Sequence, residues 1–177
     1  MSSIYSDAPP PTPEFRHTLA VIVDNEPGVL ARIAGLFSGR GYNIESLTVS
    51  ETQHEAHLSR ITIVTGGTRA VIEQIKAQLS RLVPVHRVTD LTVEGEAVER
   101  ELVLLKVVGQ GEHRLEALRL AQAFGAKTVD ATLKSFIFEF TGASDEAERF
   151  ISLMTDCGLV EVSRTGIAAL SRGAEPL

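Results

Sequence analysis

The sequence holds one cysteine, no tryptophan and two tyrosines among its 177 residues. A lone cysteine excludes an internal disulfide and any zinc site built on several cysteines, and it is typical of a chain kept in the reducing cytoplasm. No apolar run reaches the ~18 residues that a membrane-spanning helix needs. We therefore expect a cytoplasmic protein that has no membrane partner.

Basic charge is also scarce. The net charge is −6 at pH 7; residues 17–91 are balanced and residues 92–177 carry the excess of acid. Binding to nucleic acid needs a basic face that neutralises phosphates, and often aromatic side chains that stack on bases. The sequence offers neither, so we expect no nucleic-acid partner.

The first 16 residues, MSSIYSDAPPPTPEFR, contain four of the seven prolines. They lack the apolar stretch of a secretory signal and cannot bury enough apolar surface to offset the entropy of ordering. We predict that residues 1–16 form a disordered leader.

From residue 17 the pattern becomes regular. Short β-branched runs alternate with stretches in which apolar residues recur every three or four positions, the spacings of strands and of amphipathic helices. The predicted strands cover 19–23, 44–50, 58–65 and 85–91, and the predicted helices begin near residues 29 and 72. This βαββαβ order over 17–91 is the ferredoxin-like arrangement.

The same order recurs after an acidic stretch at 92–99, which we interpret as a linker. Strands are predicted at 102–108, 126–133, 135–141 and 159–163. The two helices between them are predicted to bury Leu115, Leu118, Ala121 and Phe124, and then Ala147, Phe150, Ile151, Met154 and Cys157. The fold class is therefore α+β, with ferredoxin-like domains in tandem at 17–91 and 100–166 and a C-terminal tail at 167–177.

Groups that perform catalysis are hard to find in this sequence. His54 and His57 lie three residues apart in a predicted hairpin, where that spacing puts their side chains on opposite faces. Cys157 falls on the apolar stripe of a helix, as a core residue does. No nucleophile–base pair and no metal-ligand set emerges, so we predict no catalytic residue, no metal site and no cofactor on this chain.

One group of residues does suit a ligand. The segment DNEPGVL at 24–30 places a helix N-terminus directly after a strand, and the free amides there favour a carboxylate. Gly28 has no side chain to block approach, and the side-chain amides of Asn25 and Asn43 can pair with an ammonium or a carboxylate. Val29, Leu30 and Ile44 could enclose a small apolar side chain. The residues leave two interpretations open: a site for a free aliphatic α-amino acid, or a capped helix with no ligand.

Longer segments resemble a known family. DNEPGVLARIAGLFSGRGYNIESLTV at 24–49, LSRITIVT at 58–65 and VEVSRTGIAALSRG at 160–173 are similar to the regulatory (small) subunit of acetolactate synthase, also called acetohydroxyacid synthase. The first repeat resembles the ACT domain of that subunit, a fold that senses amino acids. The sequence departs from the family in its Pro-rich leader and at Ala169, where glycine is usual.

The resemblance implies a chain that has no catalysis of its own. In this family the large subunit holds thiamine diphosphate, Mg²⁺ and FAD and makes acetohydroxy acids for branched-chain amino acid biosynthesis (valine, leucine, isoleucine). The small subunit activates it and confers feedback inhibition, usually by valine. The family's effector contacts carry over to Asn25, Pro27, Gly28, Val29, Leu30, Asn43 and Ile44.

Two alternatives stand beside this reading. One is a free-standing amino-acid sensor with two ACT-like domains that acts on another partner; the other is a small enzyme on a ferredoxin-like scaffold. The GYNIESL and LSRITIV segments favour the small subunit over the sensor, and the lack of a catalytic grouping argues against the enzyme. An open sheet edge invites pairing, so we also expect a homodimer whose effector sites lie, by analogy with the family, where two first repeats meet.

Overall fold

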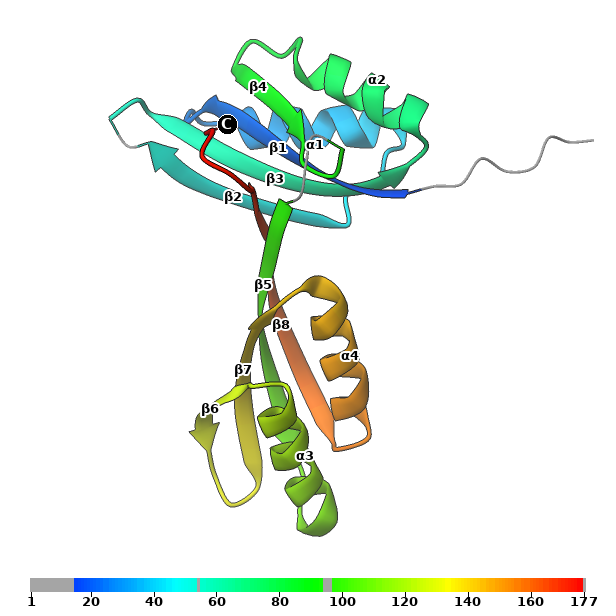
Figure 1. Cartoon of the computed structure of the whole chain (residues 1–177), viewed down its shortest axis with the longest axis vertical. Helices are drawn as coiled ribbons and strands as arrows, with labels where there is room; N and C mark the ends of the chain where they lie inside the picture. Colours follow the sequence, from blue (N-terminus) through cyan, green and yellow to red (C-terminus); the bar gives the residue numbers. More distant parts are fainter. Residues whose placement is uncertain (1–14, 54, 94–96, 177) are drawn as a thin grey trace, which may run out of the picture.

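The computed structural model describes residues 15–53, 55–93 and 97–176, and it forms two α+β domains joined by a long strand pair (Figure 1). The first domain consists of β1 (Phe15–Asp24), α1 (Val29–Arg40), β2 (Ser46–Gln53), β3 (Leu58–Gly67), α2 (Arg69–Leu79) and β4 (Val85–Asp90). Its antiparallel sheet has the strand order β2-β3-β1-β4.

The second domain repeats this plan. It consists of β5 (Ala97–Val108), α3 (Gly111–Ala123), β6 (Lys127–Ala131), β7 (Ser135–Gly142), α4 (Ser144–Thr155) and β8 (Leu159–Ser171), with the strand order β6-β7-β5-β8. The predicted fold class, two ferredoxin-like domains in tandem, is confirmed.

The core of the first domain follows the predicted periodicity. Helix α2 buries Ile72, Ile75 and Leu79, spaced by three and four residues, against one face of the sheet. Helix α1 buries Ile33 and Phe37 on the same face. Both helices therefore cover one side of the sheet and leave the other side for different contacts.

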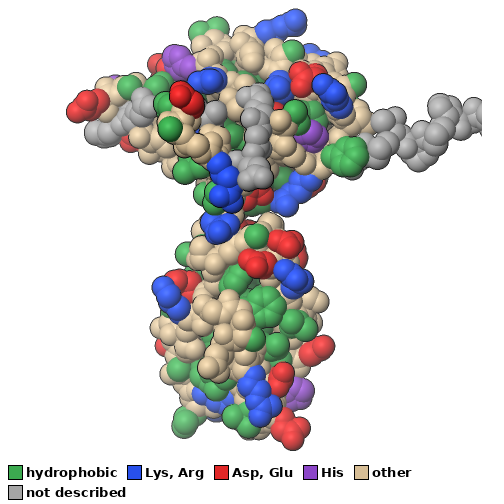
Figure 2. Space-filling model, in the orientation of Figure 1, with side chains coloured by type: hydrophobic (Ala, Val, Ile, Leu, Met, Phe, Trp, Pro, Cys, Tyr) green, Lys and Arg blue, Asp and Glu red, His purple; other side chains and the backbone are tan. Residues whose placement is uncertain are grey.

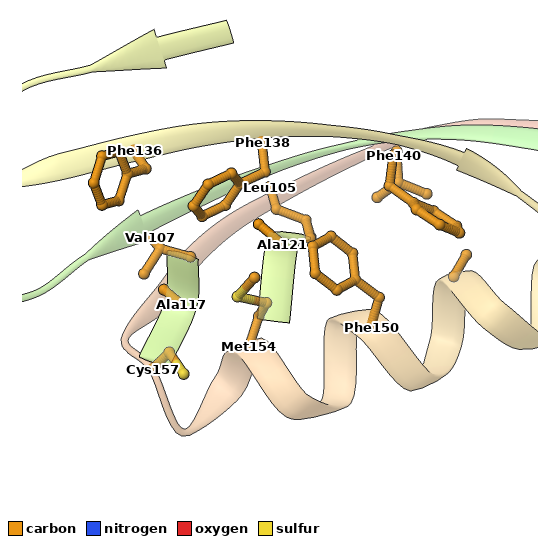
Figure 3. Close-up of a cluster of buried hydrophobic side chains, with 12 residues drawn as sticks. Leu105, Val107, Ala117, Ala121, Phe136, Phe138, Phe140, Phe150, Met154 and Cys157 are labelled. Carbon is orange, nitrogen blue, oxygen red and sulfur yellow. The ribbon is translucent and has the colours of Figure 1, made fainter. Parts of the chain in front are cut away.

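The core of the second domain is built on phenylalanine. Phe136, Phe138 and Phe140 alternate along β7 and face Phe150 and Met154 of α4 (Figure 3). Helix α4 thus buries Ala147, Phe150 and Met154 of the predicted stripe, while Ile151 is partly buried and Cys157 follows the helix. Cys157 is 3% exposed in the same cluster, and burial raises the pKa of its thiol, as expected for a core residue.

Helix α3 corrects one prediction. Leu115 and Leu118 are exposed by 56% and 37%, whereas Ala117 and Ala121 are buried at the sheet. The physical reason is space, because the phenylalanines of β7 and α4 already fill this core and only short side chains let α3 approach it. The periodicity alone predicted that the larger side chains, Leu115 and Leu118, would be the buried ones.

Strands β5 and β8 extend beyond the second domain to reach the first. We call residues 97–101 of β5 and 167–171 of β8 the neck (Figure 1). Ile167 and Ala169 are buried together with Ala20 and Val64 on the sheet face opposite α1 and α2. The predicted domain limit at residue 166 therefore falls inside β8, and much of the predicted tail at 167–177 is a strand.

The other predicted boundaries also shift. The predicted linker at 92–99 overlaps β5, which begins at Ala97, and the predicted leader at 1–16 overlaps β1, which begins at Phe15. Residues 1–14, and with them most of the leader, lie outside the described residues.

Candidate effector site

The turn from β1 into α1 leaves the start of the helix open. Gly28 is the N-cap of α1 with φ +90°, and no side chain among the described residues caps this helix. Around Gly28, no described atom lies within 4 Å of the position a Cβ would take. The Val29 N–H donates to the carbonyl oxygen of Glu26 at 3.4 Å, so the amides of residues 30 and 31, in a first turn that begins beside open space, are the ones that suit a ligand carboxylate.

The residues around Gly28 divide between surface and core. Asn25 is exposed, and its backbone N–H donates to the carbonyl oxygen of His57 at 2.7 Å, which fixes the turn. Pro27 is exposed, and Leu30 is 41% exposed. Val29 is only 5% exposed and packs in the first core, so it anchors the helix and does not line the surface.

The second predicted segment follows the other end of α1. Gly41 ends the helix with φ +71°, and the chain then passes through Asn43 and Ile44 into β2. The carbonyl oxygen of Asn43 accepts a 2.6 Å hydrogen bond from Thr65 Oγ1. The side chain of Asn43 takes no part in that bond and is exposed. Ile44 packs against the edge of the first core.

The two segments lie at opposite ends of the sheet. Asp24 is paired with Leu58 at one end of β3, whereas Ser46 is paired with Val64 near the other. Six residues of a strand span ~20 Å, and α1 bridges the same distance. Within one chain, Asn25 and Gly28 therefore lie far from Asn43 and Ile44. The sequence motifs do not reveal this separation.

A second polar site lies between the two domains, in a cleft of about 700 Å³. Arg164 of β8 donates from Nε and Nη2 to the two oxygens of Glu101 on β5, both at 2.7 Å, and also contacts Glu148 of α4. The Arg164 hydrogen bond lowers the pKa of Glu101, and the same pair raises the pKa of Arg164. Arg164, Glu101 and Glu148 are hydrogen-bonded to one another, so they form a structural ion-pair network in the cleft. The sequence alone did not predict this network.

The histidine pair offers little for metal binding. His54 lies outside the described residues, and His57 is an exposed turn residue with φ +49°. Across the described part of the chain, no three histidine, cysteine, aspartate or glutamate side chains gather in a group that could hold a metal ion.

Comparison with known protein families matches both domains. A model described as the small subunit of acetolactate synthase matches residues 100–173, and a model described as an AHAS small subunit-like ACT domain matches residues 19–87. The chain belongs to the acetolactate synthase small-subunit family. The resemblance of the first repeat to an ACT domain is confirmed. The match over residues 100–173 extends past residue 166 and includes the β8 side of the neck.

Relatives in this family span the same length. The probable acetolactate synthase small subunit of Archaeoglobus fulgidus is 48% identical and aligns over 90% of this chain and 98% of its own. The small subunit of acetolactate synthase isozyme 3 from Escherichia coli is 43% identical over 90% of this chain and 97% of its own. The crystal structure of the small subunit from Thermotoga maritima superposes with a TM-score of 0.80, at 38% identity, over 91% of this chain and 99% of that one.

The Thermotoga maritima small subunit therefore shares the two-domain plan described above. The open start of α1 lies in the ACT domain of this chain, and the neck joins that domain to the second. No helix in the described residues has the length and apolar character needed to cross a membrane.

Proposed function

We propose that this chain is the regulatory subunit of acetolactate synthase, acting in the cytoplasm. It binds the catalytic large subunit, raises its activity and makes it sensitive to feedback inhibition by valine. The observation that carries the proposal is the uncapped helix start at Gly28, in an ACT domain of the small-subunit family. Thiamine diphosphate, Mg²⁺ and FAD belong, in this proposal, to the large subunit.

The chemistry of the turn supports a small α-amino acid as effector. The first amides of α1 would receive its carboxylate, and the exposed side-chain amide of Asn25 can accept from its ammonium group. Leu30 offers a half-exposed aliphatic surface beside the same turn. A short branched side chain such as that of valine fits this combination of one anion site and one apolar contact.

A homodimer would complete the site. Among the described strands β2 has one neighbour, β3, so its outer edge is open to pairing. If two copies pair β2 with β2 in antiparallel fashion, the start of one β2 lies beside the end of the other. Asn43 of the partner subunit then reaches the end of the sheet where Asn25 and Gly28 lie. The effector site would be formed by two chains, which accounts for the ~20 Å separation within one.

Reconstitution tests the proposal. The purified large subunit is assayed for acetolactate formation from pyruvate, alone and with this chain, over a valine titration. We expect the chain to have no activity alone, to raise that of the large subunit, and to make it fall as valine rises. Failure of the chain to bind the large subunit, with amino-acid binding retained, would favour a free-standing sensor instead.

A further inference from the structure

We propose that Ser46 is a positioning residue, through which the effector segment of the ACT domain (residues 43–46) sets the angle of the second domain. The inference rests on the effector site proposed above. Ser46 is the first residue of β2 and closely follows Asn43 and Ile44, two of the predicted effector contacts. Its Oγ accepts a 3.0 Å hydrogen bond from the backbone N–H of Ile167 in the neck. The end of the effector segment is therefore bonded to a strand that leads into the second domain.

The effector segment is attached to β3 along its length. The carbonyl oxygen of Asn43 accepts from Thr65 Oγ1 at 2.6 Å. The Glu45 N–H donates to the carbonyl oxygen of Val64 at 2.8 Å, and Ser46 is paired with Val64 in the sheet. At ~3.3 Å per residue, Ser46 lies ~10 Å from Asn43. Because the backbone between them is hydrogen-bonded, a displacement of Asn43 by a ligand is passed on to Ser46.

A β-bulge at the base of the neck provides a hinge. Glu101 of β5 is paired with Ile167 of β8. The next pair joins Val103 to Arg164, so β8 has one residue more than β5 between the two pairs. Gly166, inside the bulge, has φ +83°, a conformation that favours glycine. Such a bulge bends the strand and interrupts the ladder, so it marks the point where the second domain can turn relative to the neck.

The neck itself is fixed to the first domain. Thr18 Oγ1 donates to Glu99 Oε1 at 2.5 Å. Arg60 Nη2 donates to the carbonyl oxygen of Ala169 at 2.7 Å. Figure 2 shows that the molecule narrows between the two domains, and the cleft of about 700 Å³ lies at this junction. The second domain therefore has room to turn at the bulge while the neck stays in place.

Ser46 lies directly against this hinge. A Cβ on Gly166 would lie 2.8 Å from Ser46 Oγ, so the hydroxyl fills the space beside the bulge. The same hydroxyl holds the backbone N–H of Ile167, which is 2% exposed. A movement of Ser46 either breaks this bond or moves Ile167 with it. Effector binding at Asn43 thus reaches the hinge through one side chain.

The test follows valine binding to the full chain by NMR, without the large subunit. In the unmodified chain we expect valine to shift the backbone amides of residues 43–46 and also those of 165–167. In Ser46→Ala the first set should still shift, with a valine Kd within about twofold of the unmodified value, whereas the second set should move about half as far or less. A serine that only stabilised the fold would leave the second set of shifts unchanged.

Inhibition of the complex with the large subunit gives a second measurement. At saturating valine, the activity that remains should be about twofold higher, or more, with Ser46→Ala than with the unmodified chain. Activation without valine should be retained, because Thr18 and Arg60 still fix the neck. The control is Ser163→Ala, which removes an exposed hydroxyl from β8 before the bulge and should behave as the unmodified chain does.

The outcomes separate this inference from the proposed function. If valine shifts no amide at residues 43–46 of the unmodified chain, the effector site is wrong and the inference falls with it. If those amides shift but 165–167 do not, or if Ser46→Ala matches the unmodified chain in both measurements, the effector site stands and only the role of Ser46 is overturned.

Discussion

Arg164 forms a bidentate ion pair with the carboxylate of Glu101, and both hydrogen bonds measure 2.7 Å. The pair lies at the point where the neck leaves the second domain. The Glu101 side chain is 3% exposed, whereas that of Arg164 is 32% exposed. The contact of Arg164 with Glu148 adds α4 to the same group. This pair therefore fixes the base of the neck to the second domain.

Replacing Glu101 should weaken the fold. Glu101→Gln leaves Arg164 without its buried charged partner, and we expect the free energy of unfolding at pH 7 to fall by ~2 kcal/mol, less than for a fully buried pair because Arg164 is partly solvated. Urea unfolding measures the change. The control is Glu161→Gln, which removes an exposed carboxylate paired with Lys106 on the same two strands and should have no resolvable effect.

The stabilising effect of Glu101 should also depend on pH. The folded pKa of Glu101 lies below its unfolded value, so its stabilising effect is complete above ~4.3, the ordinary pKa of glutamate, and is lost as the pH falls through the folded value. The stability difference between the unmodified chain and Glu101→Gln should therefore shrink below pH 4. A difference that stays constant from pH 7 to pH 3 would contradict the assigned role of the ion pair.

Gly166 tests the docking of the neck. Its φ is +83°, and a Cβ there would lie 2.8 Å from Ser46 Oγ and 2.9 Å from Thr48 Oγ1. Gly166→Ala should lower the free energy of unfolding by ~3 kcal/mol, from backbone strain and steric clash together, and should expose the neck to limited proteolysis. Gly173→Ala has a similar φ, +99°, in open space, so it measures strain alone at ~1 kcal/mol. Equal effects of the two variants would show that β8 does not pack on β2.

Gly28 tests the effector chemistry. Because its φ is +90° in open space, both Gly28→Ala and Gly28→Asp carry backbone strain, but only the aspartate places a negative charge at the helix start. In the complex with the large subunit, we expect Gly28→Asp to weaken valine inhibition by ~100-fold, the equivalent of ~2.7 kcal/mol. Gly28→Ala should retain most of the inhibition, and both should retain activation. Loss of inhibition in both variants to the same degree would assign the effect to the backbone and not to charge.

The oligomeric state tests the open edge of β2. The chain has a mass of 19.1 kDa, and we expect light scattering at micromolar concentration to give twice that value, with or without valine. Val49 is 44% exposed at the middle of β2, and Val49→Pro should shift the mass toward that of one chain because proline cannot donate to a strand partner. A monomer in the unmodified protein would contradict the proposed pairing.

Local patterns predicted most of the fold but not the contacts between the domains. The helix predicted near residue 72 is present, and its apolar spacing places Ile72, Ile75 and Leu79 in the core because one helix face meets one sheet face. The extension of β8 was missed because Ile167 and Ala169 bury themselves against strands more than a hundred residues away, which no local spacing reports. In α3, the spacing predicted that Leu115 and Leu118 would be buried. The phenylalanines of β7 leave room only for short side chains there, so Ala117 and Ala121 are buried instead.

The site was predicted in parts. The turn chemistry at 24–28 indicated a helix start with a glycine, and the positive φ of Gly28 with open space beside it agrees with that description. The sequence did not show that Asn43 lies at the other end of the sheet, because that depends on the register of β2 on β3. It also did not show the pairing of Glu101 with Arg164, since 63 residues separate them.

A mixed dimer tests the central claim most directly. One chain carries Gly28→Asp and the other Asn43→Ala, the two are co-expressed with different tags, and valine binding to the purified mixed dimer is measured by calorimetry. If each site takes Gly28 from one chain and Asn43 from the other, the mixed dimer keeps one site with both residues intact and binds one valine with unmodified affinity. If each site lay within one chain, both sites would be damaged, and the absence of any tight valine binding would contradict the account.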